Sequence, residues 1–166
     1  GVQICSDFDT IQQISCKSAG TDLPDCPKLY GEWENVGHCI GPNKRPFHTI
    51  IPAFLKQGTR GTALGVMGGP MQPQGHIQVV CRLLFAHQNP QAALDAPRWK
   101  VLGGKGVAIE PGFDNNVYET LRSWGHELEV AKERTVVFGG GQIVHGMKDG
   151  YVAGSDSRRD GQAASF

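Results

Sequence analysis

The sequence predicts one layered α+β domain, and three observations carry this prediction. Segments with helical spacing of apolar residues are separated by short strand candidates. A chain of 166 residues can bury one core but seldom two. Glycine accounts for 23 residues without a collagen repeat, which indicates a globular chain with many tight backbone positions. We expect the domain at residues 41–166, after a divergent, mostly irregular segment at residues 1–40.

The charges balance at 16 basic and 16 acidic side chains, and no run of one sign occurs. This balance argues against a basic nucleic-acid-binding module and against an acidic tail. The longest apolar stretches, such as residues 49–55, are too short to cross a bilayer, so no membrane partner is expected. The cysteines are odd in number and fit no zinc or redox spacing. We expect free thiols at Cys5, Cys16, Cys26, Cys39 and Cys81, and the alternative is one or two disulfides among the first four in an oxidising compartment.

The regular pattern begins after a turn-rich basic segment at residues 41–46. Residues 48–55 predict a buried strand, and Pro52 within it indicates an edge or a bulge because proline cannot donate to the ladder. Residues 57–61 predict a hairpin turn, and residues 62–67 its partner strand. This second strand leads directly into Gly68, Gly69 and Pro70.

Three helices are expected after that turn. The first, with Pro73 in its opening turn, carries one apolar stripe formed by Ile77, Val80, Cys81, Leu84 and Phe85. The second has Asn89 as its cap and Pro90 as its first residue, and it ends before Pro97. The third is capped by Asp114 and ends at Gly125. Further strands are expected at residues 107–110, 127–130, 135–138, 142–145 and 151–153.

Most sequence motifs of catalysis are absent. There is no phosphate loop, no dinucleotide fingerprint and no serine-nucleophile elbow, and the six histidines show no metal-binding spacing. We therefore expect no cofactor and no metal. Gly68 and Gly69 stand between a strand and a helix, where their amides could bind an anion or a developing oxyanion, or simply form a tight turn.

Two other features admit similar alternatives. Residues 139–141 are three consecutive glycines with no helix after them, and we expect them to be structural. Arg158 and Arg159 could bind a carboxylate, although salt links that fasten the C-terminal tail are the expectation.

Several longer motifs resemble the small catalytic subunit of the gamma-glutamyltransferase family. They are Gly41-Pro-Asn-Lys-Arg-Pro-Phe-His-Thr-Ile-Ile-Pro52, Val66-Met-Gly-Gly-Pro-Met-Gln-Pro-Gln-Gly-His76, Asn89-Pro-Gln-Ala-Ala-Leu-Asp-Ala-Pro-Arg-Trp99, Phe138-Gly-Gly-Gly-Gln142 and Gly154-Ser-Asp-Ser-Arg-Arg-Asp-Gly161. The resemblance runs in order from about Gly41 to Phe166. The form of these motifs is similar to that of the broad bacterial branch that also contains acylase-like members.

The resemblance implies part of an N-terminal-nucleophile hydrolase fold, a four-layer αββα sandwich built with a large-subunit chain of the same precursor. It implies that a threonine at the start of the small subunit attacks a gamma-glutamyl amide, and that the acyl group then passes to water or to an amino acid. It assigns Gly68 and Gly69 to the oxyanion hole. It places His48 and Thr49 where the family often has two serines that bind the glutamyl carboxylate.

The sequence also departs from the family pattern. The nucleophilic threonine would lie upstream of Gly1, and the acidic stretch that holds the substrate amino group is replaced by Lys17-Ser-Ala-Gly, with Asp22 out of register. Three hypotheses follow. The chain is a gamma-glutamyl transferase or hydrolase portion that is inactive alone, an acylase-like amide hydrolase of the same family, or a noncatalytic remnant that binds a partner or ligand.

Overall fold

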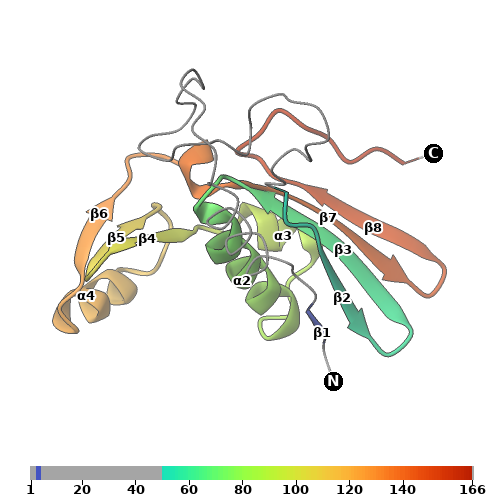
Figure 1. Ribbon diagram of the computed structural model, residues 1–166, viewed down its shortest axis with the longest axis horizontal. Coiled ribbons are helices and arrows are strands. Elements are labelled where there is room, and N and C mark those ends of the chain that lie inside the picture. The colour runs from blue at the N-terminus through green and yellow to red at the C-terminus, as the bar shows by residue number, and fades with distance from the viewer. Residues whose placement is uncertain (1–2, 5–49, 166) are drawn as a thin grey trace, which may run out of the picture. The chain divides into compact units, whose positions relative to one another are not determined.

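The computed structural model describes residues 3–4 and 50–165. Their elements are, in chain order, β1 (Gln3–Ile4), β2 (Ala53–Gln57), β3 (Arg60–Met67), α2 (Met71–Leu84), α3 (Pro90–Asp95), β4 (Trp99–Gly103), β5 (Gly106–Ile109), α4 (Asn115–Ser123), β6 (Glu127–Val130), the 3-10 helix η2 (Val136–Phe138), β7 (Gly140–Met147) and β8 (Gly150–Ser155) (Figure 1). The mixture of helices and strands confirms the predicted class.

The larger sheet has the strand order β1-β2-β3-β7-β8, with antiparallel neighbours throughout. Its first hairpin turns through two residues, because Gln57 pairs with Arg60 and Gly58 adopts a φ of +61°. β3 then pairs with β7 from Thr62 opposite His145 to Met67 opposite Gly140. The hairpin predicted at residues 57–61 and its partner strand are confirmed.

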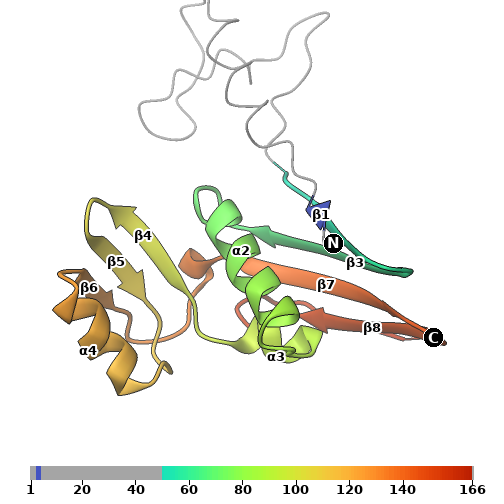
Figure 2. The ribbon, with the colours of Figure 1, turned by 90° about the horizontal axis from the view of Figure 1, so that it is seen from below.

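Helices α2 and α3 pack on one face of this sheet (Figure 2). Alternate residues of each strand point toward them, as the burial pattern of β3 shows, and successive side chains of a strand face opposite ways. Gly75 of α2 lets the helix approach β3 closely, since a Cβ there would lie 2.5 Å from Cγ1 of Val66. The resulting core consists of Ala53, Leu55, Leu64, Val66, Val79, Val80, Leu94 and Ile143.

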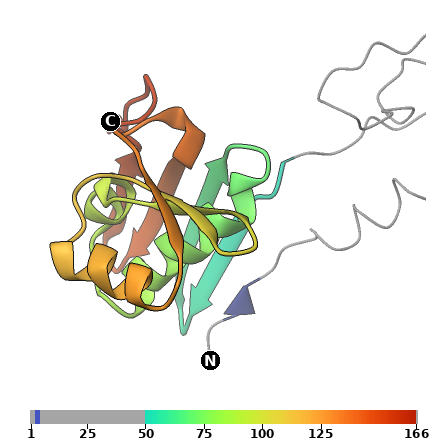
Figure 3. The same cartoon turned by 90° about the vertical axis from the view of Figure 1, so that its left-hand side faces the viewer.

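The smaller sheet has the order β4-β5-β6 and is seen from its own side, with α4, in Figure 3. β5 and β6 are parallel and are joined through α4. The side chain of Asp114 caps α4 by accepting a hydrogen bond from the amide of Asn116, and Gly125 follows the helix with a φ of +84°. The third predicted helix is therefore confirmed, as is the second, in which Asn89 caps α3 and Pro90 is its first residue.

Some predicted strands need correction. Residues 50–52 belong to no strand, and β2 begins after Pro52, which has no N–H to donate. Only Ala53 and Leu55 of β2 are buried, so the strand is not buried throughout. Residues 48 and 49 lie outside the described part of the chain. The segment predicted as a strand at residues 135–138 forms the 3-10 helix η2, whose cap is the hydroxyl of Thr135. The sequence analysis did not predict β4. The remaining strand predictions correspond to β5, β6, β7 and β8.

The apolar stripe predicted for the first helix is partly wrong. Val80 is buried, but Ile77 is 48% exposed and Phe85 is 78% exposed and lies beyond the end of α2. The helix instead buries the face that carries Met71, Gly75, Gln78 and Val79. The glycine and the glutamine hid this face, because Gly75 permits close packing and Gln78 bonds to both the N–H and the carbonyl of Trp99.

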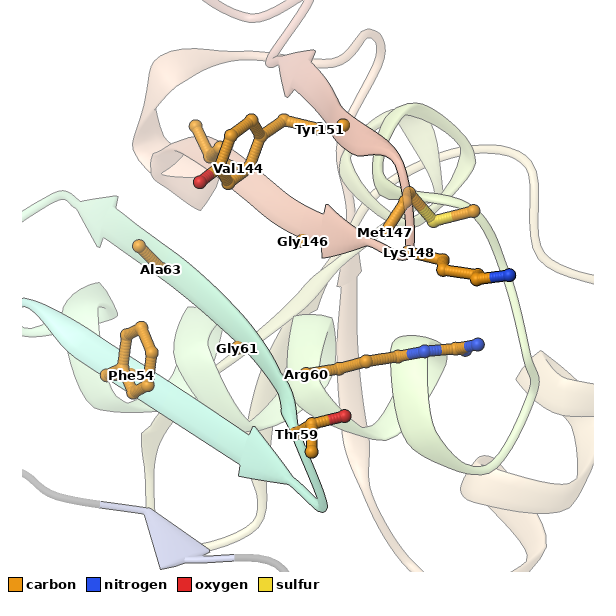
Figure 4. Close-up of a pocket in the computed structure, with 11 residues that line it drawn as sticks. Phe54, Thr59, Arg60, Gly61, Ala63, Val144, Gly146, Met147, Lys148 and Tyr151 are labelled. Carbon is orange, nitrogen blue, oxygen red and sulfur yellow. The ribbon is translucent and has the colours of Figure 1, made fainter.

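The face of the larger sheet away from the helices is exposed in the described chain. The register places Phe54, Ala63 and Val144 side by side on it, with several glycines between larger residues. A surface hollow of about 460 Å³ lies on this face between the two hairpins, with Phe54, Ala63, Val144 and Tyr151 around it and Arg60 and Lys148 at one end (Figure 4). No helix in the described residues has the length and apolar character needed to cross a membrane.

Candidate functional site

Gly68 and Gly69 form the turn between β3 and α2, as expected. Their φ angles are +139° and +56°, a backbone conformation that residues other than glycine rarely adopt. Their carbonyls accept the first hydrogen bonds of the helix, from the amides of Met71 and Gln72 at 3.1 and 2.9 Å. Among the loop and cap hydrogen bonds of the described residues, neither glycine N–H is a donor. Within the described residues, the two N–H groups of this turn are therefore without a hydrogen-bond acceptor.

The N-terminus of α2 adds to the positive character of the turn. Pro70 is the capping residue and offers no side-chain hydrogen bond, and the first turn contains no acidic residue. The helix dipole places partial positive charge at this end, where anions are stabilised. Neither a capping side chain nor a carboxylate of the first turn thus competes for an anion beside Gly69.

Gly139 supports the turn from the side. A Cβ on Gly68 would lie 3.1 Å from the Cα of Gly139, and a Cβ on Gly139 would lie 2.8 Å from the carbonyl oxygen of Met67. Gly139 itself has a φ of +79°. The turn at Gly68 and the loop at Gly139 are therefore packed backbone to backbone. Only glycine allows so close an approach.

The other two glycines of this run also allow close approaches. A Cβ on Gly140 would lie 2.5 Å from Cγ of Arg159, and one on Gly141 would lie 2.5 Å from Cδ2 of Leu94. These contacts fit the expectation that residues 139–141 have a structural role.

Behind this loop lies a buried network of two arginines and two carboxylates. Nη2 of Arg98 lies 2.6 Å from Oδ2 of Asp156, and Nη1 of Arg158 lies 3.0 Å from Oδ1 of the same residue. Arg158 also forms a two-pronged pair with Glu110. All four side chains are essentially inaccessible. The pairs are charge-assisted and hydrogen-bonded, which offsets the burial of the four charges, although Nε of Arg98 has no hydrogen-bond partner among the described residues.

The network perturbs the proton affinities of its members. Burial alone would raise the pKa of Asp156, but the N–H of Arg158, the charge of Arg98 and the N–H of Gly141 outweigh it and hold this pKa below its ordinary value. Burial lowers the pKa of Arg98 despite its ion pair, whereas bonding to Glu110 outweighs burial and raises the pKa of Arg158. Asp156 is thus held as the anion.

The two adjacent arginines of the tail have different positions. Arg158 is buried in salt links, which confirms the structural expectation for it. Arg159 is exposed, its stem lies across Gly140, and its guanidinium contacts the sulfur of Met67. No ion pair of Arg159 is present among the residues that the structure describes.

The remaining predicted site residues, His48 and Thr49, lie outside the described residues. The hollow in Figure 4 is not at the glycine turn, because Arg60 and Met67 are at opposite ends of β3, about 23 Å apart at roughly 3.3 Å per residue. Within residues 3–4 and 50–165, no group of three or more potential metal ligands occurs.

Sequence reasoning missed the contributions of Arg98 and Glu110. The sequence analysis named Arg98 only as part of the motif that ends at Trp99, and Glu110 only as the last residue of a predicted strand. A signal did exist, since charged residues that border short apolar strands in a small domain must be either exposed or paired. The pairing partners, Asp156 for Arg98 and Arg158 for Glu110, however, come from the far end of the chain.

Comparison with solved structures defines the class of fold. The chain superimposes on a cephalosporin acylase from Bacillus halodurans with a TM-score of 0.67 and 44% identity, covering 76% of this chain and 24% of that one. It superimposes on the gamma-glutamyltranspeptidase of Pseudomonas nitroreducens with a TM-score of 0.63 and 19% identity, covering 88% and 77% of the two chains. The fold is thus that of N-terminal-nucleophile hydrolases of the transpeptidase and acylase type.

Sequence comparison gives the family. The family model for gamma-glutamyltranspeptidase matches residues 22–166, so the chain belongs to the gamma-glutamyltranspeptidase family. A glutathione hydrolase-like YwrD proenzyme from Bacillus subtilis (strain 168) is 31% identical over 96% of this chain and 32% of that protein. The chain spans about a third of the length of the curated relatives of this kind. The family match begins within the segment expected to be divergent, at residue 22.

Proposed function

We propose that this chain is the small-subunit portion of a gamma-glutamyl transferase or hydrolase, and that the amides of Gly68 and Gly69 stabilise the oxyanion of the acyl-transfer step. The observation that carries the proposal is the glycine turn. It holds two N–H groups that have no acceptor within the described residues, beside an N-terminus of α2 that has no side-chain cap, within a fold shared with transpeptidases and acylases. Donors fixed in this way need no reorganisation when charge develops on the substrate oxygen.

The chemistry follows from that turn. A nucleophilic hydroxyl forms a C–O bond to the amide carbonyl carbon, and the carbonyl electron pair moves onto oxygen, where the two N–H groups stabilise it. Collapse of this intermediate breaks the C–N bond, and the departing amine takes the proton that the nucleophile gave to its base. Water or an amino acid then removes the acyl group. In this proposal the nucleophile is the hydroxyl of the N-terminal threonine of the small subunit, upstream of Gly1. The base is the α-amino group of the same threonine.

Chain lengths support a two-chain arrangement. This chain covers 77% of the solved Pseudomonas nitroreducens transpeptidase chain but only 32% of the Bacillus subtilis proenzyme. It therefore corresponds in length to one solved chain of the family rather than to a whole precursor. We propose that a large-subunit chain completes an αββα sandwich by covering the exposed face that carries Ala63 and Val144. Stacked sheets pack about 10 Å apart, and small residues suit that spacing.

His48 and Thr49 complete the proposed substrate site. The hydroxyl of Thr49 would bind the carboxylate of a glutamyl group, while His48 replaces a second hydroxyl. Thr49→Ala should raise KM for a gamma-glutamyl substrate more than it lowers kcat, because the lost bond is made equally in the ground state and the transition state.

An acylase-like activity is the second candidate. It is favoured by the 44% identity to a cephalosporin acylase and by the histidine at position 48. A panel that compares gamma-glutamyl anilide with glutaryl anilide, which lacks the α-amino group, separates the two. A preference for the glutamyl compound supports the transferase or hydrolase, and equal or reversed preference supports the acylase.

The proposal is tested by joining this chain to the upstream part of its reading frame. The isolated 166-residue chain should not hydrolyse gamma-glutamyl-4-nitroanilide, whereas the joined and processed protein should release 4-nitroaniline. Turnover by the isolated chain that Gly69→Pro abolishes would overturn the missing-nucleophile part of the account. A joined protein that hydrolyses neither anilide would instead favour a noncatalytic remnant.

A further inference from the structure

We propose that Arg98 is a positioning residue for the Gly68–Gly69 turn, acting through Gly139. This inference rests on the proposed function, because it assigns a task to a residue that touches neither the turn nor a substrate. It concerns how the backbone donors are held in place, and it is carried by contacts within the described chain.

Arg98 holds the loop that contains Gly139. Its guanidinium Nη1 donates to the carbonyls of Phe138 and Gly139, each at 3.2 Å. The side chain is 1% exposed, so water does not compete for these bonds. Its orientation is fixed by the ion pair with Asp156 and by a bond from Nη2 to the carbonyl of Leu94 at 3.2 Å.

The loop in turn limits the position of Gly68. The Cα of Gly139 lies 3.1 Å from the place where a Cβ of Gly68 would stand, and its amide nitrogen lies 3.6 Å from that place. Gly139 is also packed against the carbonyl of Met67. If the loop shifted, Gly68 would gain room to rotate, and its N–H would no longer keep one direction.

A matched control lies in the same network. Arg158 is equally buried, pairs with the same Asp156 and also donates to the carbonyl of Leu94, at 2.8 Å. Its remaining carbonyl partner is Ala96, and none of its hydrogen bonds within the described residues reaches Phe138 or Gly139. Lysine at either position keeps one positive charge but cannot reproduce the several directed bonds of a guanidinium. Both lysine variants loosen the network, and Arg158→Lys also loses the two-pronged pair with Glu110, but only Arg98→Lys removes the bonds to the carbonyls of Phe138 and Gly139.

The experiment compares Arg98→Lys and Arg158→Lys in the joined, processed protein. Active sites are counted with a covalent glutamine analogue, and kcat for gamma-glutamyl-4-nitroanilide is expressed per active site. We expect both variants to melt at lower temperature. Removing an oxyanion donor costs about 100- to 1,000-fold in kcat, so a loosened donor in Arg98→Lys should cost about tenfold with little change in KM. Arg158→Lys should keep kcat within about twofold, because the loop bonds remain.

Amide hydrogen exchange gives a second measurement that needs no substrate. Peptides spanning residues 66–72 should exchange faster in Arg98→Lys than in Arg158→Lys. If Arg98→Lys does not fold, Gly139→Ala takes its place, because its Cβ would lie 2.8 Å from the carbonyl oxygen of Met67 while the ion pairs remain intact. Equal kcat and equal exchange in the two lysine variants, or unchanged kcat in Gly139→Ala, would overturn the inference.

Failure of the underlying function gives a different result. If Gly69→Pro leaves kcat per active site unchanged, the turn is not the oxyanion hole and the proposed function fails. If Gly69→Pro lowers kcat but Arg98→Lys does not, only the positioning role of Arg98 fails.

Discussion

Arg98 and Asp156 form a buried ion pair at 2.6 Å although 58 positions separate them in the chain. Arg98 directly precedes β4 of the smaller sheet, and Asp156 directly follows β8 of the larger one. The same carboxylate accepts a bond from the amide of Gly141 at 2.8 Å. One ion pair thus links both sheets to the glycine run beside the candidate site.

Asp156→Asn should destabilise the processed protein by about 3–5 kcal/mol, because removing one partner of a buried ion pair leaves the arginine charge buried without its full counter-charge. The pKa of Asp156 is lower in the folded state, so its contribution is present above the ordinary aspartate value of about 4 and is lost as pH falls through the lower folded value. Urea unfolding between pH 7 and pH 3 should therefore show a shallower pH dependence in the variant. The exposed Asp160 provides the control, and an equal effect of Asp160→Asn would contradict this prediction.

Gly75→Ala should destabilise the domain by about 1 kcal/mol, because overpacking against Val66 outweighs the better helix propensity of alanine. In a Val66→Ala background the same change should be neutral or stabilising, since the clashing methyl groups are gone. Urea unfolding of the four proteins measures this reversal of sign. The same cost in both backgrounds would show that the helix does not pack on Val66 as described.

Val144→Lys should reduce the yield of processed two-chain protein, because a charge on the proposed inner face of the sandwich would be buried without a partner. Ile77→Lys is the matched control. Ile77 is 48% exposed and Val144 is 45% exposed, but Ile77 lies on the helix α2 and not on the proposed inner face. Chain separation on a denaturing gel and size-exclusion chromatography report processing and assembly. Equal yields from the two variants would count against the sandwich arrangement.

Local chemistry made much of the fold predictable. The β2–β3 hairpin, the caps at Asn89 and Asp114, and the stop at Gly125 all depend on residues adjacent in sequence. The errors came from tertiary contacts. Periodicity alone favoured Ile77 for the buried face of α2, but the close approach that Gly75 allows and the bonds of Gln78 turn a different face inward.

The candidate site was predictable only in part. Gly68 and Gly69 stand out in the sequence because they link a strand to a helix, and their positive φ angles agree with that interpretation. Arg98 could not be linked to them from the sequence, because its bonds reach Phe138 and Gly139, 40 and 41 positions later in the chain. The segment that ends at Phe138 is a 3-10 helix, whereas the residue pattern predicted a strand. The roles of His48 and Thr49 stay predictions.

The most direct measurement of the central claim compares Gly69→Pro with Gly69→Ala in the joined, processed protein. Alanine keeps the N–H, and although a φ of +56° strains it, no described atom lies within 4 Å of its Cβ position, so kcat per active site should change by only a few-fold. Proline removes the N–H and cannot adopt a φ of +56°, so kcat should fall about 100- to 1,000-fold while the covalent probe still labels the protein. Equal turnover by the two variants would contradict the assignment of this turn as the oxyanion hole.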